Sequence, residues 1–397
     1  MRYNIGTLKK ALEIVVPFLF ITAIIIFLVA YTDHKPVQLI NSTTPYGPHM
    51  PEKKSVPYRA AAPKVPSTSV QISERSPEVF AYAHGSVIVD GKIFIGMAAS
   101  SGNSFATNQL FVFTNPNNLK EFRIISIPRK GDIGSMVYDE KHRAIYFTLS
   151  DRGSLDIYRI DPTTYFISTV ISTTSINIGQ KPAITTDGEY IYGITYTNPA
   201  KIFKVGIYGT PFVVSEAGHI SNGHSANIGI YSSSTELYFG GGEADLFEKV
   251  NASDLSSLGI LNFPGCSMTD DMPFQRVNEN GGYVYLGCEK KPIAIRVKTD
   301  DMTAKEFALP GKSFGLYIYD NDLYNAAQDG NYDIFKNMDI SSIKRYYVGQ
   351  DIQLNELFVL NNIVLFTGWW GIKGLFSVKS MDFAQNLINN NLNTNSN

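Results

Sequence analysis

The chain has 397 residues, of which 44% are hydrophobic and 12% aromatic, so it can fold around a sizeable core and is not a disordered protein. Its 34 Lys and Arg residues against 36 Asp and Glu residues give a net charge of -2, which excludes the basic excess expected of a nucleic-acid-binding protein. The two cysteines, Cys266 and Cys288, exclude a disulfide-built scaffold and a zinc ribbon.

The N-terminal region predicts a membrane anchor. The apolar run at residues 14–31 contains no charged residue and is long enough to cross a bilayer. Lys9 and Lys10 precede it, so the positive-inside rule places residues 1–12 in the cytoplasm, a signal-anchor helix over residues 13–32 and the rest of the chain outside, in the periplasm or at the cell surface. The competing interpretation is a cleaved signal peptide, but the run is longer than the usual apolar core of such a peptide.

Two segments flank the predicted folded body at residues 67–382. Residues 33–66 are rich in proline, which disfavours helices and sheets, and we expect them to form an extended extracytoplasmic stalk. Residues 383–397 are rich in asparagine, and we expect a flexible tail there.

Seven units repeat along the body, and each contains two strands joined by a polar loop. Each strand carries an aliphatic residue followed by an aromatic or a second aliphatic residue. These pairs are Ile93-Phe94 with Leu110-Phe111, Ile145-Tyr146 with Ile157-Tyr158, Ile191-Tyr192 with Ile202-Phe203, Leu237-Tyr238 with Leu246-Phe247, Val284-Tyr285 with Ala294-Ile295, Leu323-Tyr324 with Ile334-Phe335, and Val364-Leu365 with Leu375-Phe376. The units recur roughly every 40 to 50 residues, which is the period of small antiparallel sheets arranged as propeller blades.

Turn signals divide each unit into four short strands. In an antiparallel meander the first-to-second and third-to-fourth turns lie at one end, which we call the turn face. The second-to-third loops and the connections between units lie at the other end, which we call the variable face. Residues 128–134 are predicted as such a connection and residues 368–373 as a second-to-third loop. The seventh unit lacks a fourth strand, and residues 68–73 are predicted to supply it and close the ring.

Over residues 67–382 the chain resembles seven-bladed β-propellers of the broad WD40/YVTN-like class. The resemblance is carried by the strand IYRIDP at residues 157–162, which is similar to the repeated strand of extracytoplasmic propellers. The Gly-His and Trp-Asp dipeptides of WD40 blades are not repeated, and no sialidase-type box is present. The resemblance therefore implies an architecture, and no functional residue is carried over from it.

Polar side chains on the predicted variable face are candidates for chemistry. His219, His224 and Glu243 could ligate a metal, because imidazole and carboxylate groups together suit zinc or manganese. In the alternative of a hydrolase or lyase, the histidines would act as general base beside Ser225 or Asp270, and Arg152 and Lys312 would hold an anion. The competing interpretation is that all of them are solvated loop residues, since no nucleophile elbow or paired-carboxylate motif is present.

A binding role is the stronger hypothesis for this face. Trp369 and Trp370 are the only tryptophans of the chain, and one of them could be exposed as an anchor for a sugar ring or a partner protein, although burial of both in the core is an equal alternative. The residues expected to bind a ligand or partner are Trp369, Trp370, Arg152, Lys312, Glu243 and Asp270.

Cys266 and Cys288 are predicted to form a disulfide. Cys266 lies in the connection that enters the fifth unit, and Cys288 directly follows the second strand of that unit, so both lie at the same end of adjacent strands. An extracytoplasmic location would preserve the bond. The alternative is two separate buried thiols.

Together these observations predict an all-β protein, namely a seven-bladed β-propeller of four-stranded antiparallel blades preceded by one transmembrane helix and a Pro-rich stalk. The predicted function is a recognition or assembly scaffold that binds another extracytoplasmic protein or a polar ligand such as a glycan. The alternative is an extracytoplasmic hydrolase or lyase with its site at the centre of the variable face. We expect no cofactor and no nucleic-acid partner.

Overall fold

The computed structural model describes residues between Thr68 and Asp382. The described ranges are 68–71, 81–99, 107–115, 118–119, 121–150, 154–173, 183–195, 201–208, 212–216, 225–230, 235–241, 245–266, 278–288, 290–327, 331–339, 343–347, 352–360, 363–370 and 375–382. The predicted signal-anchor helix, stalk and tail lie outside these ranges. Within them, no helix is both long and apolar enough to cross a membrane.

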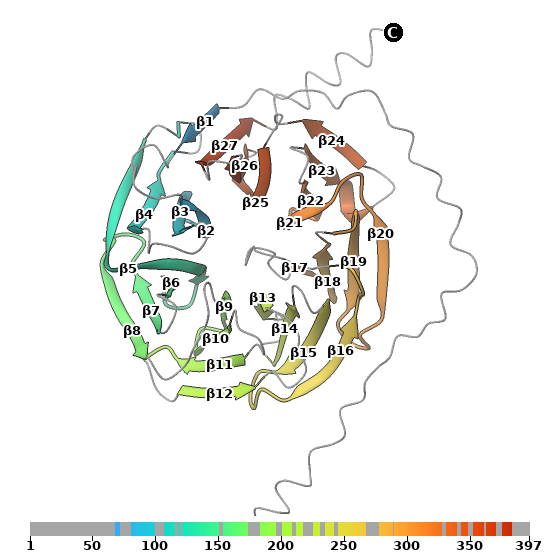
Figure 1. The fold of residues 1–397 in the computed structure, drawn as a ribbon, viewed down its shortest axis with the longest axis horizontal. Helices are drawn as coiled ribbons and strands as arrows, with labels where there is room; N and C mark the ends of the chain where they lie inside the picture. Colours follow the sequence, from blue (N-terminus) through green and yellow to red (C-terminus); the bar gives the residue numbers. More distant parts are fainter. Residues whose placement is uncertain are drawn as a thin grey trace, which may run out of the picture. The chain divides into compact units, whose positions relative to one another are not determined.

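The strands form seven four-stranded antiparallel blades around a common axis (Figure 1). Each blade contains a first, inner strand followed by three strands that lie successively further out. Blade 1 contains β2 (Ala81–Val89), β3 (Lys92–Ala99), β4 (Thr107–Phe113) and the first part of β5 (Phe122–Asp139); blade 2 contains the second part of β5, β6 (Ala144–Ser150), β7 (Leu155–Ile160) and β8 (Ile167–Thr173); blade 3 contains β9 (Ala183–Thr186), β10 (Tyr190–Ile194), β11 (Lys201–Gly206) and β12 (Phe212–Glu216); blade 4 contains β13 (Ser225–Ile230), β14 (Glu236–Gly241), β15 (Leu246–Asn251) and β16 (Ser257–Asn262). Blade 5 contains β17 (Asn278–Asn280), β18 (Tyr283–Gly287), β19 (Ile293–Lys298) and β20 (Ala304–Ala308); blade 6 contains β21 (Ser313–Tyr319), β22 (Asp322–Ala327), β23 (Asn331–Phe335) and β24 (Ile343–Tyr347), with the short 3-10 helix η2 (Lys336–Met338) before β24; blade 7 contains β25 (Ile352–Leu360), β26 (Ile363–Trp370), β27 (Leu375–Asp382) and β1 (Thr68–Gln71).

Residues 128–134 connect blades 1 and 2 as predicted, but they form a strand and not the expected loop. These residues belong to β5, an 18-residue strand that is the outermost strand of blade 1 and continues as the innermost strand of blade 2. The pairing shifts register between Thr107 and Gln109 and again between Ile133 and Met136. Such bulges bend and twist a strand, so the chain crosses from one blade to the next without leaving the extended conformation.

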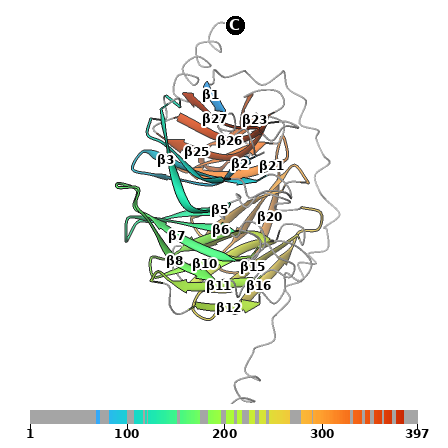
Figure 2. The same ribbon diagram turned by 60° about the vertical axis from the view of Figure 1, so that its left-hand side comes forward.

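The predicted closure of the ring is confirmed. Strand β1 pairs antiparallel with β27 over four residues, from Thr68 opposite Ser380 to Gln71 opposite Ser377. It lies beside β27 in Figure 1 and in the turned view of Figure 2. The last blade therefore combines three strands from the C-terminal end of the ring with one strand that precedes the first blade.

The hydrophobic core lies between successive blades. Neighbouring residues of a strand point to opposite faces of the sheet. In β6, Ile145 and Phe147 belong to a cluster with blade 1, whereas Tyr146 belongs to a cluster with blade 3. All three are fully buried. Similar clusters join blades 3 and 4, blades 4 and 5, and blades 5 and 6. The repeated pairs of the sequence are thus side chains buried on two sides of one blade.

A lysine of blade 3 bridges to blade 4 near the turn face. Lys204 of β11 lies opposite Tyr192 of β10, and its ammonium group donates to the carbonyl oxygen of Ala252 at 3.0 Å. The Tyr192 hydroxyl donates to Asp187 at 2.8 Å. Burial, followed by this hydrogen bond, raises the pKa of Tyr192 above its ordinary value.

The same device joins blade 4 to blade 5. Lys249 of β15 lies opposite Tyr238 of β14 and donates to the carbonyl oxygen of Thr299 at 2.7 Å. Its ammonium group also pairs with Glu236 at 2.7 Å, and the Tyr238 hydroxyl donates to Glu236 at 2.6 Å. The buried cation therefore has both a carboxylate and a carbonyl partner, as buried charges require.

Acidic side chains stabilise the third-to-fourth turns. The Asp161 carboxylate accepts hydrogen bonds from the backbone N–H groups of Thr163 at 2.7 Å and Thr164 at 3.0 Å. In blade 5, Asp301 accepts from the hydroxyl and the N–H of Thr303. These hydrogen bonds hold the pKa of both carboxyl groups below the ordinary value, because they favour the charged form. The turn face is thus built from short turns that use their polar side chains internally.

Candidate functional site

Five of the residues predicted to act in catalysis or metal binding lie outside the described residues. They are His219, His224, Arg152, Glu243 and Asp270. Within the part of the chain that the structure describes, no group of three or more His, Cys, Asp or Glu side chains could hold a metal ion. The metal and catalytic hypotheses therefore stay predictions.

The two tryptophans lie in a strand instead of the predicted loop. Trp369 and Trp370 are the last residues of β26, where Trp369 lies opposite Phe376 and Trp370 lies opposite Leu375. Both also pair with β25. Strand β26 ends at Trp370, so it is longer toward the variable face than the turn residues of the sequence predicted. The backbone therefore places both tryptophans at the variable-face end of β26.

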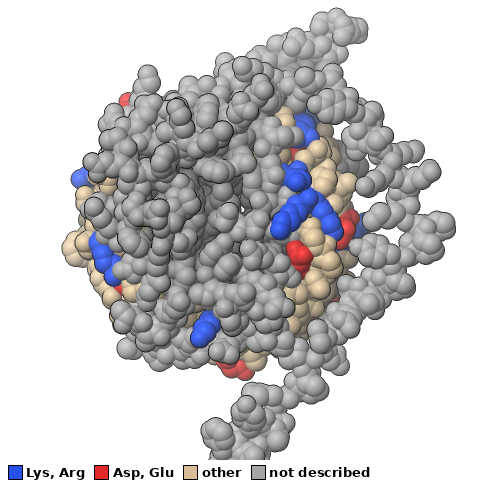
Figure 3. Space-filling model, in the orientation of Figure 1, with Lys and Arg blue, Asp and Glu red and all other residues tan. Residues whose placement is uncertain are grey.

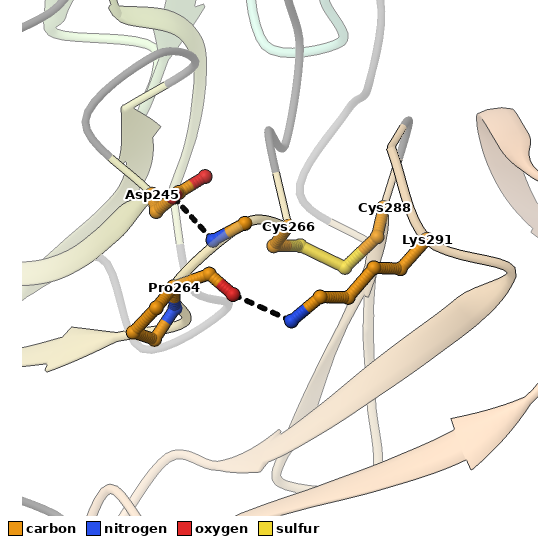
Figure 4. Close-up of a disulfide and its surroundings, with 6 residues drawn as sticks. Asp245, Pro264, Cys266, Cys288 and Lys291 are labelled. Atoms are coloured by element: carbon orange, nitrogen blue, oxygen red, sulfur yellow. Dashed lines mark hydrogen bonds between the residues drawn. A yellow bond between two sulfur atoms is a disulfide. The ribbon is translucent and has the colours of Figure 1, made fainter.

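The predicted disulfide is present in blade 5. Cys266 and Cys288 are bonded with their Cα atoms 4.9 Å apart, and both are fully buried (Figure 4). The bond joins the connection from blade 4 to the end of β18 at the variable face. Two hydrogen bonds accompany it. The Lys290 N–H donates to the carbonyl oxygen of Cys266 at 3.1 Å, and the Ser313 N–H, at the start of blade 6, donates to that of Cys288 at 3.1 Å.

A tight turn leads into the disulfide. Its four residues are Phe263, Pro264, Gly265 and Cys266, and the Cys266 N–H donates to the Phe263 carbonyl oxygen at 3.0 Å. Gly265 has a φ of +70°, which a side chain would strain, and Pro264 fixes the preceding φ. The Gly265 N–H donates to the Asp245 carboxylate of blade 4 at 2.5 Å, so the turn is held from both neighbouring blades (Figure 4).

One further segment contacts this turn, and another pairs with that segment. The Lys291 ammonium group donates to the Pro264 carbonyl oxygen at 2.5 Å (Figure 4), and the Leu309 N–H donates to the Pro292 carbonyl oxygen at 2.8 Å. We call the resulting surface, which consists of residues 263–266, 290–293 and 309–313 together with Cys288, the blade-5 platform. It joins the connections that enter and leave blade 5 with the second-to-third loop of that blade.

The blade-5 platform carries an excess of positive charge among its described residues. Lys290, Lys291 and Lys312 are all exposed. The Asp245 carboxylate of blade 4 contacts the platform by accepting the Gly265 N–H. Figure 3 shows Lys and Arg side chains, with Asp and Glu side chains beside them, on the side of the ring where β18 to β21 lie in Figure 1. This surface is suited to negatively charged groups.

A second polar cluster lies in blade 2 toward the variable face. The Arg129 guanidinium pairs with the Asp156 carboxylate at 2.7 Å and donates to the Ser154 hydroxyl at 2.7 Å. Asp156 is buried, whereas Arg129 is partly exposed. Burial, and then the charge of Asp156, raises the pKa of Tyr158 beside it. Because a buried carboxylate fixes the guanidinium in one orientation, Arg129 is held as part of the variable-face surface.

Sequence reasoning nominated Lys312 but missed Lys291 and Asp245. The Pro-Gly dipeptide at residues 264–265 is a turn signal that would have located the turn itself. Its contacts with Asp245 and Lys291 join segments far apart in the chain, and no local pattern marks them. Lys290 and Lys291 carry only the weak signal of two adjacent basic residues before a proline.

Comparison with known proteins bears on the fold. No protein-family model matches the sequence, and no curated protein matches it. The structure is similar to the Pan2 WD40 domain of Neurospora crassa, with a TM-score of 0.58, 10% identity, and coverage of 80% of this chain and 98% of that one. It is also similar to YCF48 bound to D1 peptide (TM-score 0.56, 11% identity, 81% and 97% covered) and to a chain of the mitotic checkpoint complex (TM-score 0.58, 8% identity, 82% and 94% covered). At these identities the likeness concerns the fold alone, and the chain folds as a seven-bladed β-propeller.

Proposed function

We propose that the chain is a membrane-anchored, extracytoplasmic recognition or assembly scaffold that binds another protein through its variable face. The blade-5 platform is the observation that carries this proposal. Its loops are fixed by a disulfide, a proline-glycine turn, backbone hydrogen bonds and the hydrogen bond from Lys291 to Pro264. Loops held in one conformation lose little entropy when they bind, which favours recognition.

The proposed location is supported by two independent features. The uncharged run at residues 14–31 follows Lys9 and Lys10, as in a signal anchor with a cytoplasmic N-terminus. The Cys266–Cys288 disulfide is of a kind that persists in oxidising compartments outside the cytoplasm. A propeller with a similar fold, YCF48, is bound to a peptide in its structure, and we infer a protein or peptide partner here as well.

One cross-linking experiment tests both the location and the face. A membrane-impermeant, amine-reactive cross-linker is added to intact cells that express the full-length chain, and the modified lysines are mapped by mass spectrometry. Lys290 and Lys312 lie on the variable face, whereas Lys141 lies in a turn of the turn face and Lys305 lies on the outer strand β20. All four are exposed, so all four should react.

Links to a partner protein should come from variable-face lysines such as Lys290 and Lys312, and not from Lys141 or Lys305. Absence of modification at all four lysines in intact cells would contradict the extracytoplasmic location. Modification without any partner link would contradict the scaffold role. Partner links that arise equally from Lys141 or Lys305 would show that the variable face is not the binding face.

A further inference from the structure

The charge of the blade-5 platform is concentrated on two adjacent loops. Glu289, which lies outside the described residues, Lys290 and Lys291 follow Cys288 in the second-to-third loop, and Lys312 lies in the connection to blade 6. The two loops are held together, because Ser313 N–H donates to the Cys288 carbonyl oxygen and Leu309 N–H donates to the Pro292 carbonyl oxygen. The three ammonium groups therefore belong to one surface with a fixed backbone.

Each segment of the platform also contains a proline. Pro264 lies in the turn, Pro292 follows the lysine pair and Pro310 precedes Lys312. Proline fixes φ and removes conformations from the free state. The Lys291 side chain is further aligned by its hydrogen bond to Pro264, over the face of Gly265, where its Cε and Nζ atoms would lie 3.4 and 3.6 Å from an added Cβ. The positive surface is thus organised before any ligand arrives.

We propose that the blade-5 platform binds a short acidic segment of the partner protein, with carboxylate groups seated on Lys290, Lys291 and Lys312. This inference rests on the proposed scaffold function and names the chemistry of the partner. Carboxylates form charge-assisted hydrogen bonds with ammonium groups, and these are stronger than bonds between neutral groups. Three lysines against Glu289 leave the two loops with a positive excess, which matches a run of a few Asp or Glu residues.

The scale of the charge favours a peptide over a nucleic acid. Specific nucleic-acid binding commonly neutralises about 6 to 10 phosphates, and it is accompanied by a basic excess over the whole domain. This chain has a net charge of -2, and its platform offers three lysines. A small positive surface on a nearly neutral protein attracts a small negative surface of a partner. Such charge complementarity is typical of protein interfaces.

The test uses the full-length chain in detergent and measures its affinity for a fluorescent oligo-aspartate peptide, with an oligo-serine peptide as the neutral probe. The unmodified chain should bind the oligo-aspartate peptide alone, and the binding should weaken as salt is added. The Lys290→Glu/Lys312→Glu variant should lose about tenfold in affinity, since both changes replace attraction by repulsion. Lys305→Glu makes the same kind of charge change on β20 of the same blade and should leave the affinity unchanged.

Three results would overturn the proposal. The first is no preference for the acidic peptide, and the second is equal affinity in the Lys290→Glu/Lys312→Glu and Lys305→Glu variants. The third is binding to phosphatidylserine vesicles but not to the peptide, which would assign the platform to a lipid surface. If the double variant still forms the partner links of the cross-linking experiment through Lys291, the scaffold function stands and only the acidic-segment proposal fails.

Discussion

At the scale of single residues, a basic side chain opposite a tyrosine is a repeated structural device. It occurs at the same place in four consecutive blades, with the tyrosine on the second strand and the basic residue on the third. The pairs are Tyr146 with Arg159, Tyr192 with Lys204, Tyr238 with Lys249, and Tyr285 with Arg296. In blades 3 and 4 the lysine continues to a carbonyl group of the next blade, so one side chain links two sheets of the ring.

Lys249 should contribute most to stability among these residues. Its side chain is only 10% exposed, and it satisfies both Glu236 and the carbonyl oxygen of Thr299. Lys249→Met keeps the aliphatic stem but leaves both acceptors without their cation. We expect the free energy of unfolding to fall by about 2 kcal/mol, as for the loss of charge-assisted hydrogen bonds in a partly buried pair. Urea denaturation of the full-length chain measures this difference.

Lys298 provides the matched control. It lies near the turn face of blade 5, is 39% exposed, and pairs with the exposed Asp300 and Asp301 at 3.7 and 3.5 Å. Lys298→Met should leave the unfolding midpoint unchanged, because exposed pairs contribute little. Equal destabilisation by the two substitutions would mean that the bridge from Lys249 to the next blade does not account for its effect.

At the scale of strands and loops, the periodic pairs predicted the second and third strands of every blade. Pairs such as Ile145-Tyr146 are informative because both faces of a blade are buried, so two consecutive residues must be hydrophobic. The β5 crossing was missed because Pro128, Gly131 and Gly134 resemble loop residues. Here proline lies where strands change partners, and a Cβ on Gly131 would lie 2.8 Å from the Ser150 carbonyl oxygen, so glycine permits a close strand approach.

The sequence predicted those contacts of the candidate site that follow from the order of strands within one blade. The Cys266–Cys288 bond followed from the strand order of one blade. The contacts of Asp245 with Gly265 and of Lys291 with Pro264 depend on how loops of different blades approach one another. Sequence patterns report local periodicity, and they carry no signal for such contacts.

The disulfide should be the strongest single constraint on the blade-5 platform. It joins residues 22 apart in the sequence, and closing a loop of that length restricts the unfolded chain by about 3 kcal/mol. The Cys266→Ala/Cys288→Ala variant should lose this amount of unfolding free energy in urea denaturation. Reduction and alkylation of the unmodified protein should reproduce the loss, and an unchanged midpoint in both samples would refute it.

At the scale of the whole molecule, one short strand closes the ring. The six other blades each consist of strands that are consecutive in the chain, whereas blade 7 takes its outermost strand from Thr68–Gln71. This strand directly follows the segment predicted to reach the membrane, so a force on the anchor would act first on the four residues that hold the ring shut. In the proposed membrane-anchored protein, β1 would couple fold stability to anchoring.

Deletion of residues 68–71 should open the ring at blade 7. Without β1, the backbone of β27 becomes a free edge, and such edges pair with other chains. We expect the full-length variant to lose about 3 kcal/mol of unfolding free energy through the lost backbone hydrogen bonds, and to aggregate on heating. Denaturation in urea and light scattering during a thermal scan measure the two effects.

The control is deletion of residues 58–61, which shortens the proline-rich segment by the same length and removes no residue of β1. If the two deletions unfold at the same urea concentration and scatter alike, β1 does not hold the ring closed.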